Sequence, residues 1–252
     1  MPEISLAIAT YNEEENIARC LKSTENLVSE IIAVDGSSTD GTVEILKKFG
    51  AGVTVSSNPE NFHINKNKAI DKCRGDWILQ LDADEVVTPE LKREILEAVN
   101  LKLNGFWIPR INFFLGSPLK KGGQYPDYTL RLYRRGKGRL PAKSVHEQAL
   151  VRGSTGYLKN PLYHYPYPDM IHYLQHFRRY TAFFASELEE QKLPVNPVTA
   201  ADFIVIKPLI WFIKTFFRHK GFYDGIPGLL FSFFSSLRFP VAFFKYWQKN
   251  FK

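Results

Sequence analysis

Residues 77–85 read WILQLDADE, and this stretch decides the fold class. Its first five residues are mostly apolar, which is typical of a short strand buried inside a sheet. An acidic cluster follows directly, where such a strand would end. Ligands of open parallel sheets bind outside the carboxyl ends of the strands. The stretch therefore predicts an α/β sheet and also the edge at which its chemistry takes place.

The same alternation extends toward the N-terminus. The predicted elements are strands over residues 4–9, 30–34, 52–56 and 77–81 and helices over residues 13–27, 42–49, 66–73 and 89–100. Asn12 and Thr88 are expected to cap the first and last of these helices. The order βαβαβαβα predicts a mostly parallel sheet with helices on both faces. Residues 12–14, 35 and 82–85 place polar groups at the ends of three of the four strands.

From residue 105 onward the pattern changes. Residues 106–114 and 128–133 are predicted strands, and residues 169–191 show the 3–4 spacing of one amphipathic helix. With 252 residues and 44% hydrophobic content, the chain can bury a real core and is not disordered. Its two cysteines, Cys20 and Cys73, are too few for a disulfide scaffold or a four-ligand zinc site, so both are expected to be reduced.

The charge of the chain is concentrated in its last fifty residues. Residues 203–252 carry eight Lys and Arg against one acid, Asp224, which accounts for the whole formal net charge of +7. They also hold 16 of the 36 aromatic residues. A basic, aromatic tail on a neutral body predicts a partner for the tail. Phe, Leu and Ile outnumber the basic residues there, which favours a membrane surface over nucleic acid.

Two apolar stretches of this tail, residues 203–217 and 226–247, are interrupted by charges and prolines. A simple membrane span needs ~20 apolar residues with few charges, and neither stretch meets this cleanly. Their basic residues are spaced to form one stripe per helix, opposite an apolar face: Lys207, Lys214 and Arg218 in the first, and Arg238, Lys245, Lys249 and Lys252 in the second. The pattern predicts helices that lie in the membrane interface. The alternatives are a buried helical core and a re-entrant hairpin from Gly225 onward.

Asp82 and Asp84 are the residues most indicative of chemistry. Two carboxylates one residue apart after a buried strand can converge on one divalent cation. Hard oxygen ligands suit Mg²⁺ or Mn²⁺, whose shell is usually completed by phosphate oxygens of the substrate. The alternative reading is a solvated turn.

Two further turns follow the first and second predicted strands. The turn at residues 10–14, TYNEE, can pair with a base or ribose, or can simply cap the next helix. The turn at residues 35–42, DGSSTDGT, offers the Asp35 carboxylate to a pyrimidine N–H, and its glycines allow close backbone approach. A tight turn without a ligand is the alternative there.

Together the segments at residues 10–14, 35–42 and 81–85 resemble the family-2 glycosyltransferases, in order and at family-like spacing. The resemblance implies a GT-A fold and an inverting nucleotide-sugar transferase with a divalent metal. By motif match it implies that the first two turns bind the nucleobase and ribose and the third binds the metal and diphosphate. The implied nucleotide-binding residues are Thr10, Tyr11, Asn12, Glu13, Asp35, Lys66, Lys68, Asp82 and Ala83, and the implied metal ligands are Asp82, Asp84 and His164.

The second half is similar to a subgroup, the lipopolysaccharide core glucosyltransferase-like enzymes. The similarity rests on RLYR at residues 131–134, VHE at 145–147, a later His, and GFYDGIPG at 221–228. The chain departs from many family-2 members in having His146-Glu147 for an acidic pair, and it lacks the Gln-x-x-Arg-Trp of processive members. A single transfer is therefore expected.

Inversion requires a base that deprotonates the acceptor hydroxyl. Glu147 is the expected base, oriented by His146, and Asp127 is the alternative. A structural salt bridge is the other reading of Glu147, and a packed, hydrogen-bonded residue is the other reading of His164. Arg131 and Arg134 are candidates for contacts with a phosphate of the donor or of a lipid acceptor, or are surface charges.

These observations predict three segments: a nucleotide-sugar-binding half at residues 1–104, an acceptor-binding half at 105–200, and a membrane-associating helical tail at 201–252. The expected reaction transfers one sugar from a nucleotide donor, expected to be a UDP-sugar, to a lipid-linked or lipopolysaccharide-type acceptor. The expected location is the cytoplasmic face of the cell membrane, as a peripheral or monotopic protein. The competing functions are a nucleotidyltransferase of similar fold and a non-catalytic membrane-bound scaffold.

Overall fold

A computed structural model describes residues 2–59, 61–142 and 148–250 of the chain. The chain forms two compact units, which are described separately below. The first is built from residues 1–110 and 127–164, and the second from residues 111–126 and 165–252.

The first unit contains the strands and helices of the predicted α/β alternation. Its strands in chain order are β1 (Ile4–Thr10), β2 (Glu30–Asp35), β3 (Gly52–Val55), β4 (Trp77–Leu81), β5 (Glu85–Val87), β8 (Asp127–Arg134), β9 (Gly138–Arg139), β10 (Leu150–Val151) and β11 (Thr155–Tyr157). Its helices are α1 (Glu14–Ser23), α2 (Thr42–Lys48), α3 (His63–Lys72) and α4 (Pro89–Ala98). Two further strands, β6 (Gly105–Phe114) and β12 (Leu162–Tyr167), begin in the first unit and continue into the second.

Strands β3, β2, β1 and β4 lie in that order and pair in parallel. This confirms the predicted parallel sheet, and β4 has the predicted bounds. Thr88 caps α4 as expected, because its Oγ1 accepts a hydrogen bond from the Leu91 N–H at 3.2 Å. The sheet continues from β4 in the order β8, β6, β12, β5, with β4 and β8, β8 and β6, and β12 and β5 pairing antiparallel, so it is mixed rather than parallel throughout.

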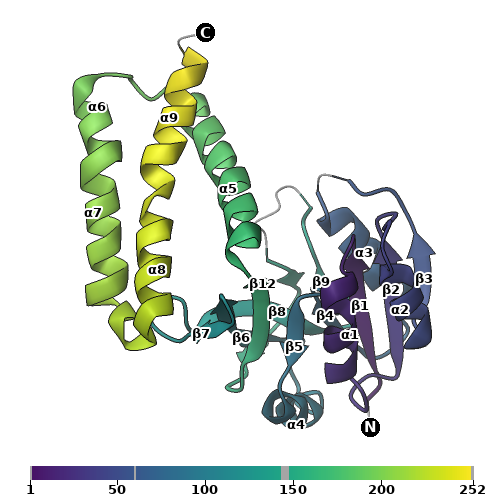
Figure 1. Cartoon of the computed structure of the whole chain (residues 1–252). Helices are drawn as coiled ribbons and strands as arrows, with labels where there is room; N and C mark the ends of the chain where they lie inside the picture. The colour runs from purple at the N-terminus through teal and green to yellow at the C-terminus, as the bar shows by residue number, and fades with distance from the viewer. Residues whose placement is uncertain (1, 60, 143–147, 251–252) are drawn as a thin grey trace. The chain divides into compact units, whose positions relative to one another are not determined.

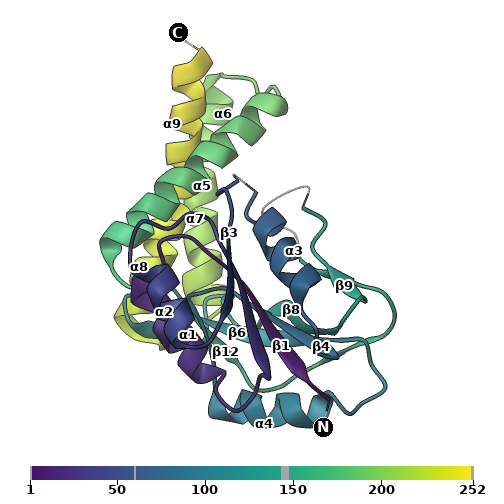
Figure 2. The same ribbon diagram turned by 90° about the vertical axis from the view of Figure 1, so that its right-hand side faces the viewer.

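Helices cover both faces of the parallel strands. Figure 2 shows α1 and α2 on one side of β1 and β4, and α3 on the other. On the first face, Ile17 of α1, Leu46 of α2 and Leu91 of α4 pack with alternate residues of β1 and β4 in one buried cluster. On the second face, Ala69 and Ile70 of α3 pack with the residues of opposite parity. Cys20 and Cys73 are buried and unbridged, one in each cluster.

The second unit is mostly helical and also contains the short strand β7 (Ser117–Leu119), which pairs with the end of β6. Its helices are α5 (Met170–Glu190), α6 (Pro197–Ala201), α7 (Lys207–Phe212), α8 (Gly225–Ser236) and α9 (Arg238–Asn250). The predicted helix over residues 169–191 is confirmed as α5, which Asp169 caps by accepting the His172 N–H at 2.9 Å.

Two long helical segments of this unit run side by side (Figure 1). In the first, π-helical turns at Asp202–Ile206 and Ile213–Arg218 flank α7. Pro208 accounts for the first of these turns, since it has no N–H to donate to the carbonyl four residues earlier. After a 3₁₀ turn at Gly221–Asp224, α8 and α9 return along the first segment, and α5 packs against α9. The predicted helical tail is thereby confirmed as helical, while its association with a membrane and the three functional segments stay predictions.

Candidate active site

The carboxyl ends of β2, β1 and β4 meet at one edge of the parallel sheet. Thr10 pairs with Asp35 in the register of β1 and β2, and Asp82 comes one residue after the end of β4. The first two predicted clusters are in direct contact there, because Thr10 Oγ1 donates to Asp35 Oδ1 at 3.0 Å.

Asp35 is completely buried and anchors the turn after β2. Its carboxylate accepts the Ser38 N–H at 2.8 Å and the Ser38 hydroxyl at 2.6 Å, besides that of Thr10. An ionised carboxylate has about four lone-pair sites, and these three bonds leave room for one further donor. The turn is therefore held rigidly by its buried acid, which has one lone-pair site without a partner among these three bonds.

Asn12 does not cap α1 by its side chain, contrary to the sequence-based expectation. Its backbone is left-handed, with φ of 54°, and α1 begins after Glu13 with no side-chain cap. Asn12 Oδ1 instead accepts the Thr39 N–H at 2.8 Å, and the Asn12 N–H donates to Ser38 Oγ at 2.8 Å. A tertiary contact replaces the local one, so the turns after β1 and β2 form a single hydrogen-bonded surface.

Glu13 lies in the same turn, and its carboxyl is half-buried. The pKa of Glu13 is raised to about 7, mainly by burial; a hydrogen bond from Asn16 opposes this rise, and the nearby Asp84 and Asp82 carboxylates add to it. Glu13 therefore changes its charge near neutral pH, and a cation bound among these acids would favour its ionised form.

Both oxygens of Asp82 are engaged by cations. Lys66 Nζ binds Oδ1, and Arg131 Nη2 binds Oδ2 at 2.5 Å. Burial acts to raise the pKa of Asp82, but Arg131 and Lys66 outweigh it and hold the pKa well below its usual range. Burial lowers the pKa of Lys66, and Asp82 counteracts this. Each oxygen of Asp82 therefore already has one cationic partner, with which a bound metal would have to share it.

Lys66 and Lys68, both implied by the family resemblance, occupy different places. Lys66 is buried against Asp82, as described above. Lys68 Nζ instead donates to Ser56 Oγ at 2.7 Å and to Asn65 Oδ1 at 3.2 Å. The structure thus brings only Lys66 of this pair to the acidic cluster.

Asp84 faces His164, with Oδ2 and Nε2 3.2 Å apart. The pairing follows from β5 and β12, whose antiparallel register sets His164 opposite Glu85. Burial would raise the pKa of Asp84, and the neighbouring His164 outweighs it, so the pKa lies below its ordinary value. Among the described residues, no group of three or more His, Cys, Asp and Glu side chains is arranged to hold a metal. A carboxylate and an imidazole do form a two-ligand donor set that substrate oxygens and water can complete.

The two arginines predicted to contact a phosphate both bind groups of the protein, and their contact with a phosphate stays a prediction. Arg131 is buried, and donates to Gln80 Oε1 at 2.6 Å and to Glu85 Oε1 at 2.7 Å in addition to Asp82. Arg134 donates to the carbonyl oxygens of Leu103 and Leu101 and lies over the Trp77 ring. Neither is a simple surface charge.

Asp127, the alternative base, is paired with Arg110. Its Oδ2 accepts from Arg110 Nη2 at 2.7 Å and Nε at 3.0 Å, as their opposed positions on β8 and β6 allow. Arg110 and Glu85 are not among the site residues predicted from the sequence. A charged residue inside the predicted strand 106–114 was the available signal for Arg110. His146 and Glu147 lie outside the described residues.

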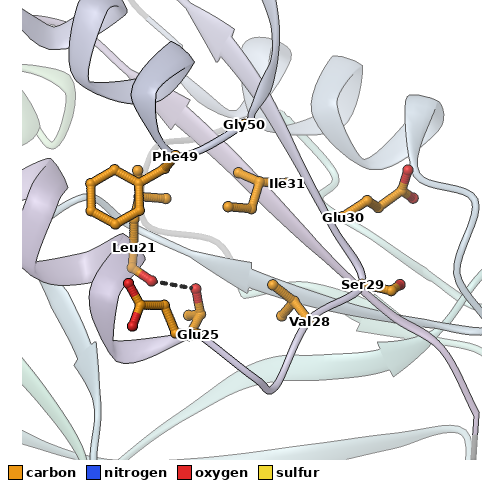
Figure 3. A pocket seen from close by; sticks show the side chains of 9 residues that line it. Leu21, Glu25, Val28, Ser29, Glu30, Ile31, Phe49 and Gly50 are labelled. Carbon is orange, nitrogen blue, oxygen red and sulfur yellow. Dashed lines mark hydrogen bonds between the residues drawn. The ribbon is translucent and has the colours of Figure 1, made fainter.

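A small cavity of about 190 Å³ lies between the ends of α1 and α2 and the start of β2 (Figure 3). Leu21, Val28, Ile31 and Phe49 line it together with Glu25 and Glu30. Because Glu30 is the first residue of β2, this cavity lies at the opposite edge of the sheet from the acidic cluster. It is therefore not part of the candidate active site.

Comparison with known proteins identifies the family. The model of "Glycosyl transferase family 2" matches residues 5–162, which include every strand-end cluster described above. An uncharacterized glycosyltransferase of Rickettsia prowazekii is 30% identical over 260 residues, covering 97% of this chain and 85% of the relative. The chain belongs to the family-2 glycosyltransferases.

Two further proteins illustrate the likeness. The lipopolysaccharide core biosynthesis glycosyltransferase LpsC of Rhizobium meliloti is 26% identical over 251 residues, covering 93% of this chain and 91% of the relative. The crystal structure of S. aureus TarS 1–349 has a TM-score of 0.49 and 17% identity, covering 97% of this chain and 88% of that chain.

This family-2 glycosyltransferase is an enzyme with a nucleotide-sugar donor, as the sequence analysis expected. The expected GT-A class is confirmed as well, with flanking helices and a sheet that is mixed where a mostly parallel one was expected. The individual site residues, the metal and the acceptor stay predictions.

Proposed function

We propose that this enzyme is an inverting, metal-dependent glycosyltransferase that moves one sugar from a UDP-sugar to a lipid-linked or lipopolysaccharide-type acceptor at the cytoplasmic face of the membrane. The observation that carries the proposal is the convergence of three strand-end clusters at one sheet edge. Three features lie at the ends of strands that are neighbours in the sheet: Asp35, whose carboxylate already accepts three hydrogen bonds; Asp82, which pairs with Arg131; and the pair formed by Asp84 and His164.

The donor is held by the turns after β1 and β2 and by the acidic segment after β4. Asp35 accepts the pyrimidine N–H with its remaining lone pair, and Thr10, Tyr11, Asn12 and Glu13 border the nucleoside. Asp82 and Ala83 follow the buried β4 directly, so they are fixed where the ribose and diphosphate pass. Lys66 supplies a buried positive charge on this side.

Asp84 and His164 are the residues that fit a divalent ion, because their side chains already meet at 3.2 Å. Bound there, Mg²⁺ or Mn²⁺ would neutralise the charge that develops on the leaving diphosphate. Asp82 adds a negative charge next to this metal site, because its ion pairs with Lys66 and Arg131 keep its carboxylate ionised.

The transfer is a single in-line displacement at the anomeric carbon. Glu147 removes the proton from the acceptor hydroxyl, with His146 orienting it, and the sugar–diphosphate bond breaks on the opposite side. Asp127 is the second candidate for the base. Its bonds to Arg110 fix its orientation but also occupy its Oδ2.

A lipid-type acceptor fits the helical unit, which exposes many large apolar side chains. On the segment around α7 these are Val198, Ile204, Val205, Ile206, Leu209, Ile210, Ile213 and Phe217, and on α8 and α9 they are Ile226, Leu229, Phe233, Phe244 and Trp247. Apolar surface of this extent marks an interaction site. The name of LpsC, a lipopolysaccharide core biosynthesis enzyme, supports an acceptor of that class.

Fewer side chains of the two basic stripes are available to bind anionic lipid than their spacing predicts. Lys245 Nζ donates to the Arg178 carbonyl and Thr181 Oγ1 of α5, and Lys249 pairs with Glu189 at 2.9 Å. In the first stripe Lys207 pairs with Asp202, whereas Lys214 and Arg218 remain exposed. The apolar face therefore dominates binding, and Lys214 and Arg218 add the electrostatic part.

Within the described residues, one helical stretch, Gly221–Lys249, is long and apolar enough to cross a membrane by length and composition alone. An 18-residue window of it has a mean hydropathy of 1.4, and 28% of that window is buried in the structure. A re-entrant or spanning arrangement therefore stays open as an outcome of the vesicle experiment.

In vesicle co-sedimentation, we expect the triple change Leu209→Gln, Ile213→Gln and Phe217→Gln to weaken binding to neutral and anionic vesicles alike. Each of these half-exposed side chains contributes about 1 kcal/mol when it enters lipid, which gives roughly a 10²-fold loss in partitioning. The matched change Lys214→Gln and Arg218→Gln should weaken binding to anionic vesicles by roughly 10- to 30-fold and leave neutral vesicles unaffected, at about 1 kcal/mol per basic residue.

The control is wild-type protein across a range of salt concentrations. If it stays in the supernatant with anionic vesicles at low salt, the apolar face is an internal or oligomer contact. If neither salt nor carbonate extracts it from vesicles, the helices enter the bilayer instead of lying on it.

The proposed reaction is tested by thermal-shift screening with UDP-, GDP-, dTDP- and CMP-sugars, with and without Mn²⁺, followed by product analysis. We expect stabilisation by a UDP-sugar that requires Mn²⁺, and release of UDP when an acceptor is added. Release of pyrophosphate from a nucleoside triphosphate would instead indicate a nucleotidyltransferase. A chain that responds to no nucleotide would be a scaffold and would contradict the proposal.

A further inference from the structure

An unbroken series of ion pairs runs through the first unit beside the donor site. From one end to the other, alternating charges are contributed by Lys66, Asp82, Arg131, Glu85, Arg110 and Asp127. The six formal charges cancel, so the series as a whole is neutral.

Three consecutive members of the series, Arg131, Glu85 and Arg110, are more deeply buried than the two aspartates that flank them. The Glu85 side chain is completely inaccessible, and those of Arg131 and Arg110 are 9% and 18% exposed. The two outer carboxylates, Asp82 and Asp127, are 27% and 35% exposed. A buried core therefore joins two partly exposed acids, one at the donor site and one at the start of β8.

Glu85 is the shared partner of both arginines. Its Oε1 accepts from Arg131 Nη2 at 2.7 Å and from Arg110 Nη1 at 3.3 Å. Its Oε2 accepts the backbone N–H of Asp82 at 2.9 Å. Arg131 in turn binds Asp82 Oδ2, and Arg110 binds Asp127 through two nitrogens. Glu85 thus binds the backbone of Asp82 directly and its side chain indirectly, through Arg131.

We propose that Glu85 is a positioning residue that sets the donor-site carboxylate Asp82 through Arg131 and the carboxylate Asp127 through Arg110. Neither arginine can leave its carboxylate without losing part of its bond to Glu85, and a buried unpaired charge is costly. The orientation of Asp82 therefore depends on groups at the far end of the series that do not touch it. The inference rests on the proposed function, because it requires that Asp82 contacts the donor.

The test uses Glu85→Gln and Arg110→Lys, alone and combined, with UDP-sugar binding measured by calorimetry in Mn²⁺. A glutamine keeps the shape but presents an amide donor to groups that themselves donate. A lysine keeps the charge but cannot bridge two carboxylates as the guanidinium fork does. We expect each variant to lose about 5-fold or more in donor affinity, the usual lower range for coupled sites.

The combined variant should bind no more weakly than Glu85→Gln alone, because both changes break the same linkage. A general loss of stability would not produce this non-additivity. The matched controls are Glu90→Gln and Arg93→Lys, which alter an exposed ion pair of α4 at 3.7 Å. We expect the controls to bind the donor as the wild type does.

Unfolding midpoints show whether each variant folds. If Glu85→Gln does not fold, the donor affinity of Arg110→Lys alone tests the inference. This variant is expected to fold because it retains the positive charge at a partly exposed position. Donor affinity equal to that of the wild type in folded Arg110→Lys would overturn the inference and leave the proposed function intact. A wild type that binds no nucleotide would overturn both.

Discussion

Replacing Asp84 by alanine should abolish Mn²⁺-dependent UDP binding and sugar transfer while the fold survives. Asp84 and His164 are the two described side chains that fit the metal, and the change removes the charged member of the pair. A metal at the leaving group contributes several kcal/mol of transition-state stabilisation, so turnover should fall roughly 10³-fold or more. The fold should survive because the Asp84 side chain is 23% exposed and belongs to no core cluster.

The measurement is calorimetric titration of UDP with and without Mn²⁺, together with initial transfer rates. Asp71→Ala is the matched control, because Asp71 is an exposed carboxylate of the same unit that pairs with Arg139. The control should retain binding and rate. Unchanged turnover of Asp84→Ala in Mn²⁺ would remove the metal site from the proposal.

The parallel half of the sheet could be predicted from the sequence because its signals are local. The apolar run at Trp77–Leu81 and the polar turns after it depend on neighbouring residues, and β4 has the predicted bounds. Asp35, Asp82 and Asp84 can be identified as candidates for the same reason, since Asp35 is the last residue of β2 and the other two lie within three residues of the end of β4. Local periodicity is thus sufficient to locate the edge of the sheet that carries the site.

The partners of these acids could not be predicted in the same way. Glu85 belongs to the three-residue strand β5, which has no periodicity of its own and forms by pairing with β12, some 75 residues later. That pairing brings His164 to Asp84, and the register of β6 with β8 brings Arg110 to Asp127. Such long-range pairs depend on the whole sheet, so single-residue patterns do not reveal them.

The helical tail illustrates the same distinction. Its helices follow from spacing, but the direction of each basic side chain depends on what packs nearby. Lys245 and Lys249 belong to a regular stripe, yet both of their ammonium groups bind residues of α5. Spacing alone therefore overstates the charge that α9 presents to a membrane.

The second large effect is expected at the proposed base, Glu147, where replacing one carboxylate oxygen by an amide nitrogen should greatly lower the rate of sugar transfer. Glu147→Gln should keep donor binding and lose turnover by ~10²–10⁴-fold, which is the usual contribution of a general base. The glutamine retains shape and hydrogen bonding but cannot take the acceptor proton. Donor affinity from calorimetry and single-turnover rates from product analysis separate the two effects.

Asp127→Asn is the decisive comparison, because the same chemical change is made at the competing carboxylate. Asp127 Oδ2 already accepts two hydrogen bonds from Arg110, and a proton taken up there would break that ion pair. If Glu147 is the base, Asp127→Asn should change the rate far less than Glu147→Gln. Full activity of Glu147→Gln together with a dead Asp127→Asn would reverse the assignment. The base would then be the Asp127 carboxylate, which Arg110 holds, and its proton transfer would depend on the series of ion pairs that connects it to Asp82.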